Sequence, residues 1–115
     1  MIDDLLKQPD GSIKEIDLGD ELDNVEFEKK YEILTNLLKK ISKGGSIRIS
    51  GIDIAVLGVL INSSLVSIPD VNKFLKTSVD RMVNVERFLE TQGFLITERR
   101  IIENGKYLLS ARYKV

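Results

Sequence analysis

The sequence of 115 residues contains no cysteine and no histidine. Their absence excludes disulfide bonds, thiolate zinc sites, Cys or His nucleophiles and imidazole acid–base catalysis. The longest apolar run, Ile52–Ile61, is interrupted by Asp53 and Gly58 and is too short to span a bilayer. The N-terminus contains Asp3 and Asp4 where a signal peptide is basic, so we expect a cytoplasmic protein.

What the sequence does contain is ordinary for a globular domain: 43% hydrophobic and 30% charged residues, in a length that fits one domain over 1–115. The net charge of −1 is unevenly spread, because residues 1–42 sum to −5 (six Lys, eleven Asp/Glu) and residues 43–115 sum to +4 (eleven Lys/Arg, seven Asp/Glu). This asymmetry fits a charged partner or a second copy packed head to tail.

The N-terminal half predicts a strand, a helix and a second strand. Turn residues at Pro9–Ser12 precede a short strand at Ile13–Leu18. A helix is predicted over Glu26–Ser42, ended by Lys43–Gly45, with a strand at Ser46–Ser50 after it. The apolar stripe of that helix comprises Phe27, Tyr31, Leu34, Leu37, Leu38 and Ile41.

The middle of the chain gives weaker signals. Gly51–Leu65 is apolar, and most of it predicts a short helix that begins near Asp53 and is buried or at an interface. Pro69 interrupts, and Asp70–Lys76 is compatible with another helical turn. A clear helix follows at Ser78–Gln92, capped by Thr77 or Ser78. Its inward face comprises Met82, Val85, Phe88 and Leu89.

The C-terminal residues predict an antiparallel hairpin. Two long strands, Phe94–Ile102 and Tyr107–Val115, are joined by a segment containing Asn104-Gly105, which favours a type I′ turn. The element order is therefore β–α–β–α–(α)–α–β–β, an α/β domain whose mixed sheet of about four strands carries helices and ends in the hairpin.

This order resembles the C-terminal half of the class I S-adenosylmethionine-dependent methyltransferases. The segments similar to that family are Gln8–Leu18 (its approach to the fourth strand), Gly19–Val25 (the loop after it), Leu37–Ile49 (the run into strand five) and Phe88–Phe94 (the run into strand six). The resemblance covers nearly the whole chain and implies a truncated, half Rossmann-like domain. The alternative to a family resemblance is that these segments are only common α/β connections, in which Gly-Gly or Gly-Phe joins a helix to a strand.

The same resemblance implies what is missing. The family's cofactor half holds a first strand, a Gly-rich turn and an acidic residue at the end of the second strand, and only about seven residues precede the matched region here. Lys43-Gly44-Gly45 is read as ending a helix and opening a strand, the reverse of the polarity that binds anions. We therefore expect no catalytic and no cofactor-binding residues in this chain alone. Methyl transfer would need a partner that supplies the other half.

The only candidate site residues are Asp20, Asp23 and Asn24. By the resemblance they follow a strand at its carboxyl end, where open α/β sheets place ligands. Asp20 and Asp23 belong to an acidic cluster that also contains Asp17, Glu21 and Glu26. A solvated helix start is a better interpretation of that cluster than a cation site, because the spacing of a calcium loop is absent.

Two interpretations of function follow. In the first, the chain is a methyltransferase-like module that is non-catalytic alone. The strand Ile13–Leu18 would then have an unpaired edge, which predicts association with a partner chain or a second copy, most simply a twofold homodimer near this strand or Ile54–Ile61. The alternative is a winged-helix nucleic-acid binder, with the basic residues Arg99, Arg100, Lys106, Arg112 and Lys114 on its wing. Parallel pairing of the first two strands would favour the first interpretation.

Overall fold

The computed structural model describes residues 2–53, 81–102 and 106–114. Their helices and strands, in chain order, are α1 (Ile2–Leu6), β1 (Ile13–Gly19), the 3-10 helix η1 (Glu21–Asn24), α2 (Phe27–Lys39), β2 (Ile41–Ile52), α5 (Met82–Thr91), β3 (Phe94–Ile101) and β4 (Lys106–Tyr113). The expected α/β class and mixed four-stranded sheet are confirmed.

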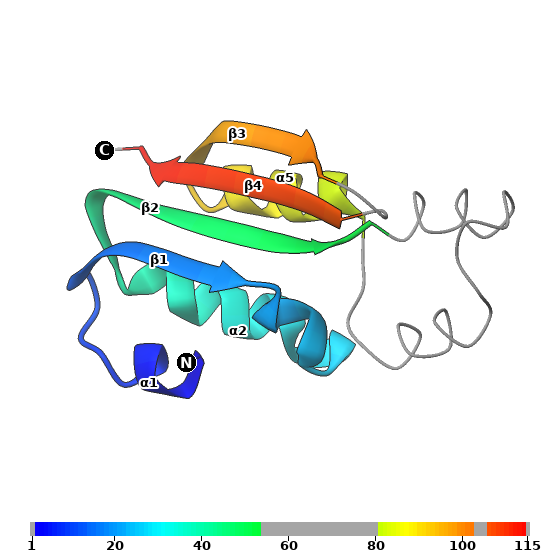
Figure 1. Cartoon of the computed structure of the whole chain (residues 1–115). Coiled ribbons are helices and arrows are strands. Elements are labelled where there is room, and N and C mark those ends of the chain that lie inside the picture. Colours follow the sequence, from blue (N-terminus) through cyan, green and yellow to red (C-terminus); the bar gives the residue numbers. More distant parts are fainter. Residues whose placement is uncertain (1, 54–80, 103–105, 115) are drawn as a thin grey trace, which may run out of the picture.

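The four strands form one sheet in the order β1-β2-β4-β3, as Figure 1 shows. β1 runs parallel to β2, with Ile16 opposite Ile47, whereas β2–β4 and β4–β3 are antiparallel. Parallel pairing of the first two strands is the arrangement expected of a methyltransferase half. Among the described strands, β1 and β3 are the two edges.

Both long helices cover the same face of the sheet. A single apolar core joins buried residues of α2 and α5 to alternate residues of the strands, and these include Leu34, Val85, Ile16, Ile47 and Leu109. α2 lies under the β1 side and α5 under the β4–β3 side (Figure 1). The predicted inward face of α5 is confirmed, since Val85 and Leu89 are fully buried and Met82 and Phe88 pack against the core.

Most side chains on the opposite face of the sheet are polar, although Ile52 and Leu108, which also point to this side, are buried. Glu15 and Asp17 of β1, Arg48 of β2 and Arg112 of β4 are exposed there, and Ser110 is half-buried. An antiparallel sheet commonly buries one face and leaves the other in solvent, whereas parallel strands are commonly covered on both faces. We call this surface the open face.

The boundary between α2 and β2 differs from the prediction. α2 ends at Lys39 and β2 already begins at Ile41, so Gly44-Gly45 does not end the helix; it lies inside the strand. The pairing of β1 with β2 skips from Ile13↔Ile41 to Glu15↔Ser46 around the glycines. A Cβ on Gly45 would lie 2.7 Å from the Lys14 carbonyl oxygen, and Gly44 has a φ of 76°. These are the marks of a bulge that only glycine accommodates.

Other boundaries shift by smaller amounts. The first strand extends to Gly19, and α5 begins at Met82 instead of Ser78. Gly51 and Ile52 belong to β2, so this strand extends two residues beyond the predicted end at Ser50. The remaining expectations for Gly51–Leu65, for Asp70–Lys76, for the Thr77 or Ser78 cap and for the Asn-Gly turn lie outside the described residues. The short helix α1 carries no signal that we identified in the sequence.

The hairpin is confirmed in its described parts. Tyr107, Leu109 and Ala111 of β4 are buried on the covered face. Tyr113 continues this alternation and stacks on Phe94 of β3 with ring centroids 5.0 Å apart. The two strands therefore complete the core over α5.

Candidate functional site

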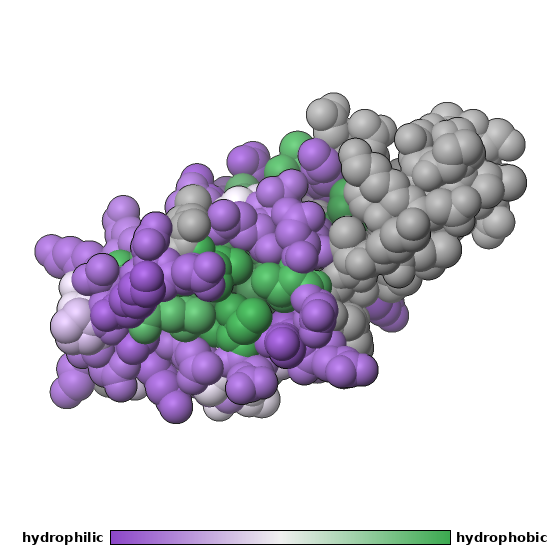
Figure 2. Space-filling view, turned by 90° about the horizontal axis from the view of Figure 1, so that it is seen from below, coloured by the Kyte–Doolittle hydropathy of each residue, from purple (hydrophilic) through white to green (hydrophobic). Residues whose placement is uncertain are grey.

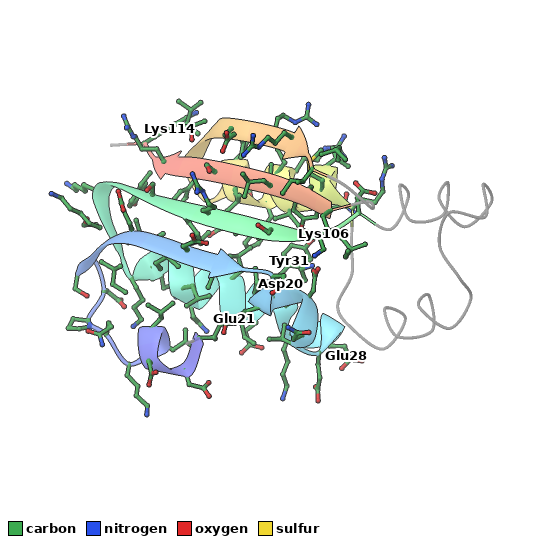
Figure 3. The ribbon with its side chains drawn as sticks, viewed as in Figure 1. Asp20, Glu21, Glu28, Tyr31, Lys106 and Lys114 are labelled. Carbon is green, nitrogen blue, oxygen red and sulfur yellow. The ribbon has the colours of Figure 1, made fainter. Side chains whose placement is uncertain are left out.

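The carboxyl ends of β1 and β2 lie side by side because the two strands are parallel. η1 follows β1 directly, and Asp53 follows β2. Figure 3 shows Asp20 and Glu21 at this end of β1. Open α/β sheets bind ligands outside the carboxyl ends of their strands, so this edge is the candidate site.

Asp23 is the buried centre of this edge. One carboxylate oxygen, Oδ2, accepts a hydrogen bond of 2.9 Å from the backbone N–H of Ile52. The other, Oδ1, lies 3.6 Å from Nζ of Lys30, whose side chain is 1% exposed. Burial raises the pKa of Asp23, and the Lys30 ammonium and the Ile52 N–H offset this only in part. Asp23 thus ties η1 to the end of β2 and to α2.

Gly51 allows the strand end to pack closely on this cluster. A Cβ at Gly51 would lie 2.8 Å from the Tyr107 hydroxyl oxygen and 3.1 Å from Oδ1 of Asp23. No side chain fits at these distances unless its neighbours move. The cluster of Asp23, Lys30 and Tyr107 is therefore a packed polar core.

Asp53 accepts a hydrogen bond from the N-terminus of α5. Its side chain is buried, and Oδ2 accepts a hydrogen bond of 3.0 Å from the backbone N–H of Met82. A helix N-terminus can bind an anion when its N–H groups are free. Here a carboxylate of the chain itself already accepts the bond from the first residue of the helix.

The three candidate residues therefore lie close together at η1, but they differ in exposure to solvent. Asp20, the residue before η1, and Asn24, its last residue, are exposed, whereas Asp23 is buried. The sequence reasoning did not identify Lys30, Asp53 or Tyr107 as parts of this edge. Lys30 carried a signal, because it precedes Leu34 and Leu37 at helical spacing and is thus a charged residue within the apolar stripe.

A second concave surface lies on the open face. A shallow groove of about 380 Å³ is lined by Glu15, Asp17, Arg48, Ser110 and Arg112, among others. Nε of Arg48 donates a 3.4 Å hydrogen bond to the Ser110 hydroxyl, and a guanidinium nitrogen of Arg48 lies 4.0 Å from Glu98. The groove is acidic on its β1 side, from Glu15 and Asp17, and basic on its β2 and β4 side, from Arg48 and Arg112.

The basic residues of the hairpin do not form one patch. Lys106 and Lys114 lie at opposite ends of β4 (Figure 3). Arg99 pairs with Glu86 at 2.7 Å, and Arg100 lies 3.9 Å from Glu98. With β1 parallel to β2, this arrangement does not favour the winged-helix interpretation.

The described residues 2–53, 81–102 and 106–114 contain no group of three or more acidic side chains placed to hold a metal ion. Within the same residues no helix is long and apolar enough to cross a membrane. The candidate site is thus defined by carboxylates, a buried ammonium and backbone groups.

Comparisons with known proteins support the fold. No family model and no curated protein sequence matches the chain. Solved structures do match, with identities too low to show more than the fold. The magnesium protoporphyrin IX methyltransferase of Synechocystis PCC 6803, with bound SAH, has a TM-score of 0.68 at 15% identity, over 96% of this chain and 48% of that one. A SAM-dependent methyltransferase of Methanosarcina mazei has a TM-score of 0.69 at 13% identity, over 95% and 63%.

A third match comes from a complex between a Haloferax volcanii methyltransferase activator and the putative methyltransferase. Its TM-score is 0.67 at 9% identity, over 95% of this chain and 57% of that one. The chain has a partial methyltransferase fold and spans about half the length of the structures it matches.

The described residues do not fit S-adenosylmethionine. Gly44-Gly45 lies within β2 and does not precede a helix, so its N–H groups are not aligned with a helix dipole. The turn at Gly19 leads into η1, a 3-10 helix of 4 residues, which is too short to present an aligned helix N-terminus to the cofactor. Asp53 occupies the start of α5. No step involving the cofactor is therefore derived for this chain.

Proposed function

We propose that this chain is a methyltransferase-like module that transfers no methyl group by itself and works through association with a second chain. The observation that carries the proposal is the position of β1. It pairs with β2 on one side, and no other described strand pairs with it on the other. Unpaired strand edges favour pairing with another chain.

One of the matched structures supports the same proposal. The matched structures extend well beyond the region that this chain covers, and those described with SAM or SAH are longer proteins. One matched structure is a complex with an activator protein. The second chain at β1 is then either another copy, as in a twofold homodimer, or a different protein.

Calorimetric titration with S-adenosylmethionine tests the first half of the proposal. We expect no heat of binding for the 115-residue chain alone. Binding in the micromolar range would contradict the non-catalytic assignment, because a cofactor site would then exist within one chain.

Light scattering tests the second half. A homodimer predicts twice the monomer mass of 13.0 kDa at tens of micromolar. A monomer at that concentration rules out the homodimer and leaves a different protein as the second chain. Titration with peptides tests whether a different protein binds at β1.

A further inference from the structure

β1 presents a charged and an apolar side to any strand placed next to it. Glu15 and Asp17 are exposed on the open face. Ile16 and Leu18, which alternate with them, are buried on the covered face. Because side chains of neighbouring strands meet on the same face, an added strand would meet carboxylates on one side of the sheet.

A groove lies beyond this edge in the helix layer. It has a volume of about 340 Å³ and lies between α1, the end of η1 and α2, with Ile2, Leu6, Val25 and Ile33 as its apolar lining and Asp3 and Glu21 beside them. Oε2 of Glu21 is buried, and no hydrogen-bond partner for it exists among the described residues. Figure 2 shows an apolar band flanked by hydrophilic residues on this side of the molecule. The covered side of the edge therefore offers apolar contacts with acids near them.

A second copy of β1 fits this edge poorly. In a twofold antiparallel pair centred on Ile16, Glu15 of each copy faces Asp17 of the other. A pair centred on Glu15 or on Asp17 places that acid against itself. Like charges directly opposite each other destabilise a strand pair, and charged residues on an edge are a common means of preventing self-association.

We propose that the free edge of β1 binds an extended segment of a different protein in which Lys or Arg alternates with apolar residues. The basic side chains face Glu15 and Asp17 on the open face, and the apolar ones face the groove formed with α1. Main-chain hydrogen bonds supply the affinity and the alternating side chains supply the choice of partner. The −5 charge of residues 1–42 attracts such a segment. This inference rests on the proposed function and names the chemistry of the second chain.

The probe is a fluorescein-labelled nine-residue peptide of alternating Lys and Val, titrated with the chain in a fluorescence anisotropy experiment. We expect saturable binding that weakens as salt increases. A peptide of alternating Glu and Val should bind at least about tenfold more weakly, since two cross-strand charge pairs change sign. NMR shifts on binding should be largest for the amides of Ile13–Gly19. Equal binding of both peptides, or shifts confined to other elements, would overturn the inference.

Charge reversal on the chain gives the matched test. Glu15→Lys should weaken the Lys-Val peptide severalfold, and Glu15→Lys with Asp17→Lys about tenfold or more. The control is Glu90→Lys, an exposed acid on α5, and it should change binding less than twofold. Asp17 also accepts a 3.1 Å bond from the Gly19 N–H, so the single Glu15 variant keeps that turn intact. An unchanged affinity in both β1 variants contradicts the proposed site.

The remaining outcomes separate this inference from the proposed function. A chain that is dimeric and binds neither peptide has a second copy at its edge, which overturns the inference and keeps the proposed function. A monomeric chain that binds neither peptide overturns both. A monomer that prefers the Lys-Val peptide supports both.

Discussion

The two faces of the sheet are built from the same four strands, yet over most of their area they differ in polarity and in exposure to solvent. On the face toward α2 and α5, Ile47, Leu109 and Ala111 are at most 1% exposed. On the open face, Arg48 and Arg112 alternate with those residues and are exposed. An apolar open face would require a covering layer, and a polar one does not. Among the described strands, this partial fold therefore leaves the edges of β1 and β3 unpaired, and most of the open face needs no covering layer.

The largest expected effect lies on the covered face. Leu109→Ala removes a side chain with no exposure from the centre of the core and should lower the free energy of unfolding by about 3 kcal/mol. Urea denaturation followed by circular dichroism measures this loss. The matched change on the next residue along the strand toward the open face, Ser110→Ala, should cost less than about 1 kcal/mol. Equal losses would show that the two faces are packed alike.

How much of this contrast could be predicted from the sequence differs between segments. The alternation in β4 and the inward residues of α5 follow the simple periods of a strand and a helix, and both predictions were correct. The predicted end of the helix at Ser42 was wrong because of Ile41. One apolar residue directly after a helix fits the apolar stripe of that helix as well as it fits the start of a strand. Gly44-Gly45 then suggested a helix end, although the glycines serve a bulge against Lys14.

The candidate site was harder to predict. The sequence placed Asp20, Asp23 and Asn24 after a strand, and they do follow β1 directly, but their role as site residues stays a prediction. Their different exposure depends on Ile52 and Lys30, which are 29 and 7 residues away from Asp23 in the chain. The sequence marks Lys30 as a charged residue within an apolar stripe, but it contains no local signal for the residue that Lys30 contacts. The unpaired edge of β1 was predicted from the family's strand order, and this prediction is confirmed among the described strands.

An intermediate loss of stability is expected at Lys30 and Asp23, the buried charged pair beside the apolar core. Lys30→Met removes the charge next to Asp23 and leaves a carboxylate that is only 10% exposed. At pH 7 this should cost about 2 kcal/mol, below the range for a completely enclosed pair because Asp23 keeps some solvent contact. Chemical denaturation at several pH values measures the loss. Lys29→Met, one residue earlier and exposed, is the control and should change stability by less than about 0.5 kcal/mol.

The pH dependence of that loss has a defined sign. The pKa of Asp23 is already raised by burial, and removal of Lys30 raises it further. A carboxyl group whose pKa is higher in the folded state than in the unfolded state lowers stability as the pH rises from the unfolded pKa through the folded one. The cost of Lys30→Met should therefore shrink as the pH falls toward 3.8, the ordinary pKa of the carboxyl group. A cost that is constant from neutral pH to pH 4 would show that the Lys30 stem, and not its charge, stabilises the fold.

The smallest effect is expected on the open face. Arg48 contacts Glu98 at 4.0 Å and the Ser110 hydroxyl at 3.4 Å, but the side chains of Arg48 and Glu98 are 54% and 40% exposed. Exposed ion pairs contribute little because water screens the charges and the long side chains lose rotamer freedom. Arg48→Ala should therefore change the free energy of unfolding by less than about 0.5 kcal/mol, measured as for Leu109→Ala. A loss comparable to that of Leu109→Ala would mean that the open face is part of the packed structure.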